Sequence, residues 1–181
     1  MSLLLCFSGQ IGSGKSSVST SVAAALGCGR MGFGDYLRSE IARLGGDPND
    51  RKALQDLGQK RVKDDSVAFC RDVLAASGFQ PGDNFVIDGV RHVAILEILA
   101  KLSKPSKTRL LHLGAAERTR NVRVQSREDG QDFVRASTHH VEAELQDTLP
   151  LRADAVIDAD QPFDRVVADC LEVVRNWQAG L

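Results

Sequence analysis

The chain has 181 residues, of which 43% are hydrophobic and 26% charged, so it is long enough for one domain with a buried core. Its net charge of −1 gives no overall field that would gather nucleic acid or an acidic membrane, so any bound anion must meet a local cluster of charge. No apolar run approaches the roughly 20 residues that cross a bilayer, and the first residues lack the basic start of a signal peptide, so we expect a cytoplasmic protein.

Short apolar segments and segments of helical periodicity alternate along the chain. The apolar segments are continuous rather than alternating, which is typical of strands covered on both faces. They predict strands at Leu3–Ser8, weakly at Arg30–Phe33, and at Phe85–Asp88, Arg109–Leu113 and Ala155–Asp158. The periodic segments predict helices at Lys15–Leu26, Tyr36–Leu44, Arg51–Ala76, Val93–Leu102, Glu117–Arg127, Phe133–Leu145 and Asp164–Trp177. This alternation predicts one three-layer α/β domain over residues 1–181, with a mainly parallel five-stranded sheet flanked by helices.

The stretch GQIGSGKSS, directly after the first predicted strand, carries the strongest functional signal. It satisfies the pattern G-x-x-x-x-G-K-[ST] at Gly9, Gly14, Lys15 and Ser16. Glycines in such a loop let backbone N–H groups turn inward, and the following helix adds its positive end, so the loop favours a polyphosphate such as ATP. Lys15 would reach the β and γ phosphates, and the Ser16 hydroxyl would bind Mg²⁺. The expected nucleotide-binding residues are Gly9, Gly12, Ser13, Gly14, Lys15, Ser16 and Ser17.

A second candidate segment is FVIDGVR, in which a carboxylate ends a buried strand and an arginine follows. Asp88 at this position would meet Mg²⁺ through water, although an aspartate that caps a helix is the alternative. Arg91 would form bidentate hydrogen bonds with phosphate oxygens.

The third segment, GFGDYLR, follows the weak second strand and lies at the start of an expected acceptor-binding part, about residues 35–77. Asp35 would orient or deprotonate an acceptor, and Arg38 lies one helical turn further on, on the same side. The alternative is that Asp35 caps the helix and Arg38 is its solvated partner.

The fourth segment is rich in arginine and predicts a short lid at about residues 120–135. On a helix Arg120, Arg123 and Arg127 form one stripe, which runs into the turn EDGQD. Arginines that close over a transferring phosphoryl group stabilise its charge and exclude water. A solvated surface helix is the alternative.

Taken together, these four segments resemble the nucleoside monophosphate kinase group of P-loop NTPases, which includes adenylate kinase-like, dephospho-coenzyme A kinase-like and phage deoxynucleoside monophosphate kinase-like enzymes. GQIGSGKSS resembles their phosphate loop, GDYLR their acceptor-side segment, and IDGVR their strand-end segment with its arginine. The resemblance implies an ATP-dependent phosphotransferase that uses Mg²⁺ and acts on a small nucleotide-like molecule. The residues it assigns to the site are Lys15, Ser16, Arg38, Arg91, Arg123 and Arg127.

The acceptor is left open at this point. A (deoxy)nucleoside monophosphate is the first expectation, dephospho-coenzyme A the second, and a P-loop ATPase or switch protein with no small-molecule acceptor the third. A phosphate acceptor is already ionised near neutral pH, whereas a hydroxyl acceptor would make Asp35 important as a base. The candidate catalytic residues are Lys15, Asp35, Arg91, Arg123 and Arg127.

Overall fold

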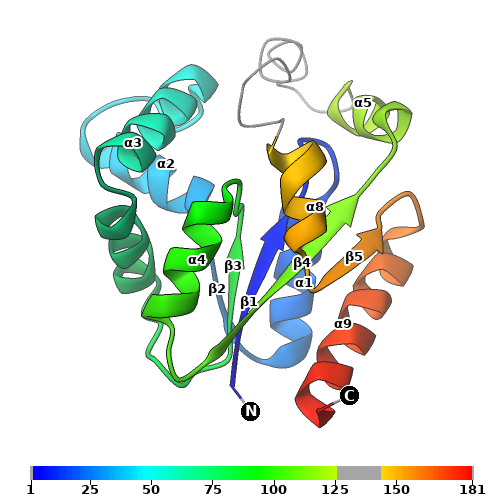
Figure 1. Ribbon diagram of the computed structural model, residues 1–181. Coiled ribbons are helices and arrows are strands. Elements are labelled where there is room, and N and C mark those ends of the chain that lie inside the picture. The colour runs from blue at the N-terminus through cyan, green and yellow to red at the C-terminus, as the bar shows by residue number, and fades with distance from the viewer. Residues whose placement is uncertain (1, 126–143, 181) are drawn as a thin grey trace.

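The computed structural model, shown in Figure 1, describes residues 2–125 and 144–180. Its strands are β1 (Leu3–Ser8), β2 (Gly29–Gly32), β3 (Phe85–Asp88), β4 (Lys107–Gly114) and β5 (Ala155–Asp158). They form one sheet in the order β2-β3-β1-β4-β5, and every neighbouring pair is parallel. The carboxyl ends of all these strands therefore meet at one edge of the sheet, directly before the segments that the sequence singled out.

The strands alternate with helices, as parallel crossovers require. The helices are α1 (Lys15–Leu26), α2 (Phe33–Arg43), α3 (Arg51–Ser77), α4 (Val93–Leu102), α5 (Glu117–Gln125), α8 (Leu149–Arg152) and α9 (Phe163–Ala179), and a π-helical turn, η2 (Glu144–Thr148), precedes α8. No helix among the described residues is both long enough and apolar enough to cross a membrane.

The central strand β1 divides the hydrophobic core in two, because its successive side chains point to opposite faces of the sheet. Leu3, Leu5 and Phe7 pack with side chains of α1 and α9, whereas Leu4 and Cys6 pack with side chains of α3, α4 and α8. Helices thus cover both faces of the sheet (Figure 1), and all six residues of β1 are buried. The expected three-layer α/β architecture with a five-stranded parallel sheet is confirmed.

The predicted boundaries hold at β1, β3, β5, α1 and α4 and shift elsewhere. The helix expected from Tyr36 begins earlier, at Phe33, because the Asp35 carboxylate accepts a hydrogen bond from the Gly32 N–H (3.1 Å) and closes its first turn. The long helix α3 is interrupted at Asp65, whose backbone is extended and whose side chain accepts from the Ala68 N–H (2.8 Å). Most of the helix expected at Phe133–Leu145, with much of the expected lid, lies outside the described residues.

Candidate active site

A cleft of about 290 Å³ lies at the carboxyl edge of the sheet. In a parallel α/β sheet this edge is the usual position for a ligand, at the point where the strand order reverses. Here the chain runs from β1 outward to β2 and later crosses back from β3 to β4. The cleft is lined by the phosphate loop, the first turns of α2, the first half of α3 and the segment that follows β3.

The phosphate loop forms one wall of this cleft. Gly12, Gly14, Lys15 and Ser16 line it, and Gly12 and Gly14 both have φ near +84°, a backbone region that L-residues avoid. The Ser13 N–H donates to the Gln10 carbonyl (3.1 Å), which closes the turn. Helix α1 begins at Lys15, so the N–H groups of its first turn, which have no acceptor within the helix, lie at the cleft. A backbone of this shape, with a helix N-terminus beside it, is suited to bind phosphate groups.

The remaining loop residues take different positions. Gly9 and Ser13 are buried behind the lining residues, and the Ser13 hydroxyl has no hydrogen-bond partner among the described residues. Ser17 is exposed and is not among the residues that line the cleft. The nucleotide-binding role that the sequence assigns to Ser17 therefore stays a prediction.

Asp88 ends β3 and reaches the cleft although only 4% of its surface is exposed. Its Oδ2 atom accepts a hydrogen bond from Nη2 of Arg30 (2.8 Å), while Oδ1 is buried with no partner among the described residues. A buried carboxylate oxygen without a partner is unusual in a folded protein and points to a ligand or water at this place. The Ser16 hydroxyl lines the same cleft.

These two oxygen groups fit Mg²⁺, as they fit other hard divalent cations. Mg²⁺ prefers carboxylate, hydroxyl and phosphate oxygens and keeps several of its waters, so one or two protein groups suffice. The described residues contain no group of three His, Cys, Asp or Glu side chains that would hold a metal ion without a substrate. Ser16 and Asp88 are therefore the residues that would hold Mg²⁺ together with bound phosphates.

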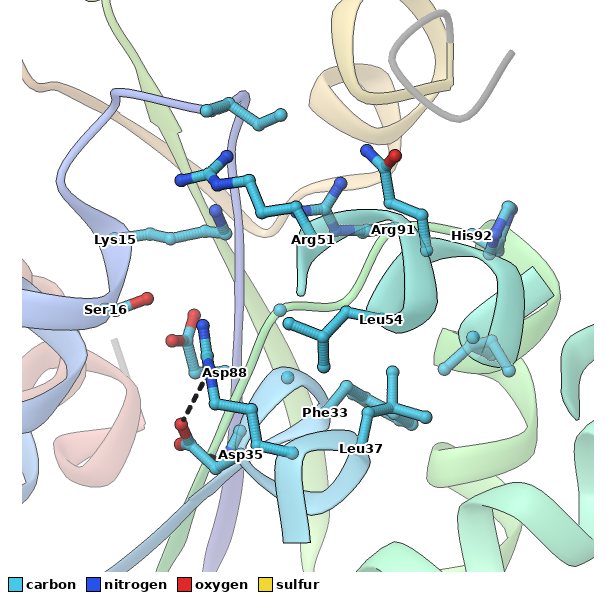
Figure 2. Close-up of a pocket in the computed structure, with 18 of the residues that line it drawn as sticks. Lys15, Ser16, Phe33, Asp35, Leu37, Arg51, Leu54, Asp88, Arg91 and His92 are labelled. Atoms are coloured by element: carbon cyan, nitrogen blue, oxygen red, sulfur yellow. Dashed lines mark hydrogen bonds and ion pairs between the residues drawn. The ribbon is translucent and has the colours of Figure 1, made fainter. Parts of the chain in front are cut away.

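Asp35 lies in the first turn of α2, and both of its oxygens are engaged. Its Oδ2 atom accepts from the Gly32 N–H (3.1 Å) and from Nη1 of Arg30 (2.9 Å), and its Oδ1 atom from Nη1 of Arg38 (3.4 Å). Asp35 thus supports the start of the helix and pairs with Arg38, as the alternative interpretation required. Asp35 and Arg38 nevertheless both line the cleft, and Figure 2 shows Asp35 there.

Two basic side chains enter the cleft from the segment after β3 and from the start of α3. Arg91 follows β3 and lines the cleft as expected, and Arg51, the first residue of α3, lines it as well. Figure 2 shows the side chains of Arg51 and Arg91 extended into the space beside Lys15. Sequence reasoning missed Arg51 because nothing in its neighbourhood in the chain distinguishes it from a solvated first-turn residue.

The opposite wall of the cleft is apolar. Figure 2 shows Phe33, Leu37 and Leu54 across the cleft from Lys15 and Ser16. Val62, Phe69 and Ile95 extend this wall, while Gln55 and Gln59 add two amides from α3. Gly58 lies on the same stretch of α3, where an added Cβ atom would come within 3.2 Å of Leu37 Cδ1. The wall is therefore apolar with two amides beside it, and it is closely packed at Gly58.

Arg120 and Arg123 of α5 both donate hydrogen bonds to backbone carbonyls. Arg123 donates from Nη2 to the Ala159 carbonyl (2.8 Å) and from Nη1 to the Ser13 carbonyl (3.3 Å), so it fastens the phosphate loop to the segment after β5. Arg120 donates to the Ala115 carbonyl (3.3 Å). Arg127 lies outside the described residues.

A buried histidine, His112, contacts the end of β1 directly before the phosphate loop. Ser8, the last residue of β1, pairs in register with His112 on β4, and the Ser8 hydroxyl lies 2.9 Å from Nδ1 of His112. Burial, with a smaller contribution from the Lys15 ammonium, lowers the pKa of His112 to about 4. The imidazole is therefore neutral at pH 7, and it places no charge beneath the phosphate loop.

The fold and the phosphate loop together define a protein with the fold of P-loop kinases. A solved structure with this fold is a gluconokinase from Sinorhizobium meliloti 1021, which matches with a TM-score of 0.56 and 20% identity over 93% of this chain and 89% of that one. At this level of identity the likeness shows the fold.

The curated proteins place the chain more narrowly. No family model matches it. A UPF0200 protein of Aeropyrum pernix is 33% identical over 99 residues, which is 55% of this chain and 52%, about half, of that protein. A UPF0200 protein of Methanosarcina barkeri is 26% identical over 181 residues, 96% of this chain and 95% of that protein. The chain is thus similar to UPF0200 proteins and has a P-loop kinase-like fold.

Proposed function

We propose that this protein is an ATP-dependent kinase that transfers the γ-phosphoryl group of ATP to a nucleotide-like acceptor, a (deoxy)nucleoside monophosphate. The observation that carries the proposal is a single cleft with a phosphate loop at one end, three arginines on its acceptor side and an apolar wall between α2 and α3. The phosphate loop at one end and the arginines on the other side suit a phosphorylated donor and a phosphorylated acceptor, and the apolar wall suits a ring.

At the donor end, Lys15 and the N–H groups of the loop bind the β and γ phosphates. Ser16 and Asp88 would hold Mg²⁺ together with the bound nucleotide, and the ion would supply positive charge that offsets the negative charge of the phosphates. Lys15 also stabilises the charge that spreads over the moving phosphoryl group. Arg123 holds the loop in shape through the Ser13 carbonyl. Arg127, which lies outside the described residues, stays a candidate from the sequence alone.

At the acceptor end, Arg38, Arg51 and Arg91 bind the acceptor phosphate and hold its oxygen in line with the γ phosphorus. The base then lies on the apolar wall, where the amides of Gln55 and Gln59 reach its polar edge. Substrate positioning and charge stabilisation supply most of the rate in phosphoryl transfer, so no covalent intermediate with the protein is needed.

The environment of Asp35 supports a phosphate acceptor over a hydroxyl. A base that removes a proton from a hydroxyl must accept a hydrogen bond from it. Asp35 Oδ2 already accepts from Arg30 and the Gly32 N–H, and Oδ1 accepts one long hydrogen bond, 3.4 Å, from Arg38, with which a substrate hydroxyl would compete. An acceptor phosphate, ionised near neutral pH, needs no such base, and Asp35 then serves to orient Arg38.

The test is a coupled assay of ADP release from Mg·ATP against ribo- and deoxynucleoside monophosphates, dephospho-coenzyme A, gluconate, nucleosides and no acceptor. Lys15→Ala is the inactive variant, and Lys101→Ala, an exposed lysine of α4 outside the cleft, is its matched control. Stimulation by one monophosphate, lost only in Lys15→Ala, supports the proposal. Stimulation by a hydroxyl acceptor alone, or ADP release that no acceptor changes, contradicts it.

A further inference from the structure

Arg30 of β2 donates three hydrogen bonds beside the cleft, near Asp88. Its Nη2 donates to Asp88 Oδ2 (2.8 Å), its Nη1 to Asp35 Oδ2 (2.9 Å) and its Nε to the Ser19 hydroxyl (2.9 Å). The Ser19 hydroxyl in turn donates to the Ser16 carbonyl (3.0 Å). One guanidinium therefore links the metal-binding carboxylate, the acceptor-side helix and the turn that carries Ser16.

The guanidinium of Arg30 lies between two carboxylates and offsets the repulsion between them. Two carboxylates lie on adjacent nitrogens of one side chain, and Asp88 is nearly fully buried. Without a cation between them, they would repel each other in a region of low dielectric. Arg38 contributes a further positive charge, but it contacts only Asp35 and its side chain is 50% exposed. Arg30, whose side chain is 19% exposed, is the cation that compensates Asp88.

The pairing also decides which oxygen of Asp88 is left without a hydrogen-bond partner. Arg30 takes Oδ2, and Oδ1 is left buried and without a partner among the described residues. The positive charge of Arg30 beside Oδ2 offsets part of the negative charge of the two carboxylates. A divalent ion without nucleotide should therefore bind only weakly between them. The pairing leaves Oδ1 to accept a hydrogen bond from water on an ion that arrives with the nucleotide.

We propose that Arg30 is a positioning residue that acts as a tethered cation: it occupies the gap between Asp35 and Asp88, excludes divalent metal from that gap, and reserves Asp88 Oδ1 for Mg²⁺ bound to nucleotide. The role assigned to Asp88 rests on the proposed function. The exclusion of metal depends only on the two carboxylates and the guanidinium between them. Removal of the charge of Arg30 should therefore create a metal site in the nucleotide-free protein.

The experiment measures Mn²⁺ binding to the nucleotide-free protein, from the loss of the electron paramagnetic resonance signal of free Mn²⁺. Arg30→Met and Arg30→Gln remove the charge, and Arg30→Lys keeps it. Arg43→Met is the matched control, because Arg43 is an exposed arginine that pairs with one carboxylate, Glu40, outside the cleft. The two neutral variants should bind Mn²⁺ about tenfold or more tightly than wild type, and Arg30→Lys and Arg43→Met should not.

A second comparison locates the new site. Adding Asp35→Asn to Arg30→Met removes one of the two carboxylates and should abolish the gain in Mn²⁺ affinity. If a neutral variant is poorly folded in metal-free buffer, Mn²⁺ should raise its melting temperature while that of wild type stays unchanged. A loss of folding alone would not increase the affinity for metal, so a purely structural role of Arg30 predicts no gain.

Three outcomes overturn the inference: neutral variants that bind Mn²⁺ no better than wild type, a gain that persists after Asp35→Asn, or a neutral variant that stays unfolded in millimolar Mn²⁺. None of these measurements uses ATP turnover or an acceptor. Failure of the acceptor assay would contradict the proposed function but not the exclusion of metal by Arg30. Failure of the Mn²⁺ experiment would contradict the exclusion of metal but not the proposed function.

Discussion

Gly12 and Gly14 have the same backbone angle but different surroundings, so alanine at these two positions separates strain from overlap. Both have φ +84°, where an L-residue costs about 1–2 kcal/mol. A Cβ atom at Gly12 would also lie 2.7 Å from the Arg120 carbonyl oxygen and 3.0 Å from Arg120 Cα, whereas at Gly14 the nearest atom is 3.9 Å away. The overlap at Gly12 involves backbone, which cannot move aside as a side chain can.

Gly12→Ala should therefore destabilise the protein by about 1–3 kcal/mol more than Gly14→Ala, the usual cost of forcing an extra methyl group into a packed place. Gly78→Ala is the control for backbone strain alone, because Gly78 has φ +73° and nothing within 4 Å of its added Cβ atom. The gain from a less flexible unfolded chain is common to all three substitutions and cancels. The assay is urea unfolding of the nucleotide-free protein, and equal losses in all three variants would refute the close contact between the phosphate loop and α5.

Three further predictions concern a pH response, the cleft wall and the acceptor. Folding lowers the pKa of His112 from 6.5 to about 4, so its contribution to the free energy of unfolding is fully present above pH 6.5 and is lost as the pH falls toward 4, by up to about 3 kcal/mol. In urea unfolding, His112→Asn should therefore lose less stability than wild type over this pH range, and the same pH dependence in both proteins would contradict a neutral buried His112. Gly58→Ala should raise the KM of the acceptor more than that of ATP, since the new Cβ atom would lie 3.2 Å from Leu37 Cδ1 and displace this side chain of the cleft wall; an unchanged acceptor KM would count against the wall. Asp35→Asn should reduce kcat with a monophosphate by less than about tenfold, and a loss of a hundredfold or more would identify Asp35 as a general base.

The fold and the donor end of the cleft were predictable from local sequence. The strand before Gly9 is continuous and apolar, the loop pattern is specific, and the helix after it follows at once, so three neighbouring signals agree. Asp88 was predictable for a similar reason, because a polar residue that ends a buried strand must lie at the carboxyl edge of the sheet.

The roles of Arg30 and His112 were not predictable, because each depends on strand order. Arg30 meets Asp88 only because β2 pairs with β3, 58 residues further along the chain. Ser8 meets His112 only because β1 also pairs with β4. The position of Arg123 depends on a long-range contact of the same kind, with the loop backbone and the segment after β5. Local periodicity carries no information on such pairings.

The central claim is phosphoryl transfer, and the most direct measurement follows the label from ATP that is radioactive at its γ phosphorus. After incubation with Mg²⁺ and the monophosphate that gives the largest stimulation, the products are separated by chromatography. The account predicts that the label appears in the nucleoside diphosphate, and that Lys15→Ala abolishes the transfer while Lys101→Ala does not. Label found only in inorganic phosphate would contradict it and would make the protein an ATPase.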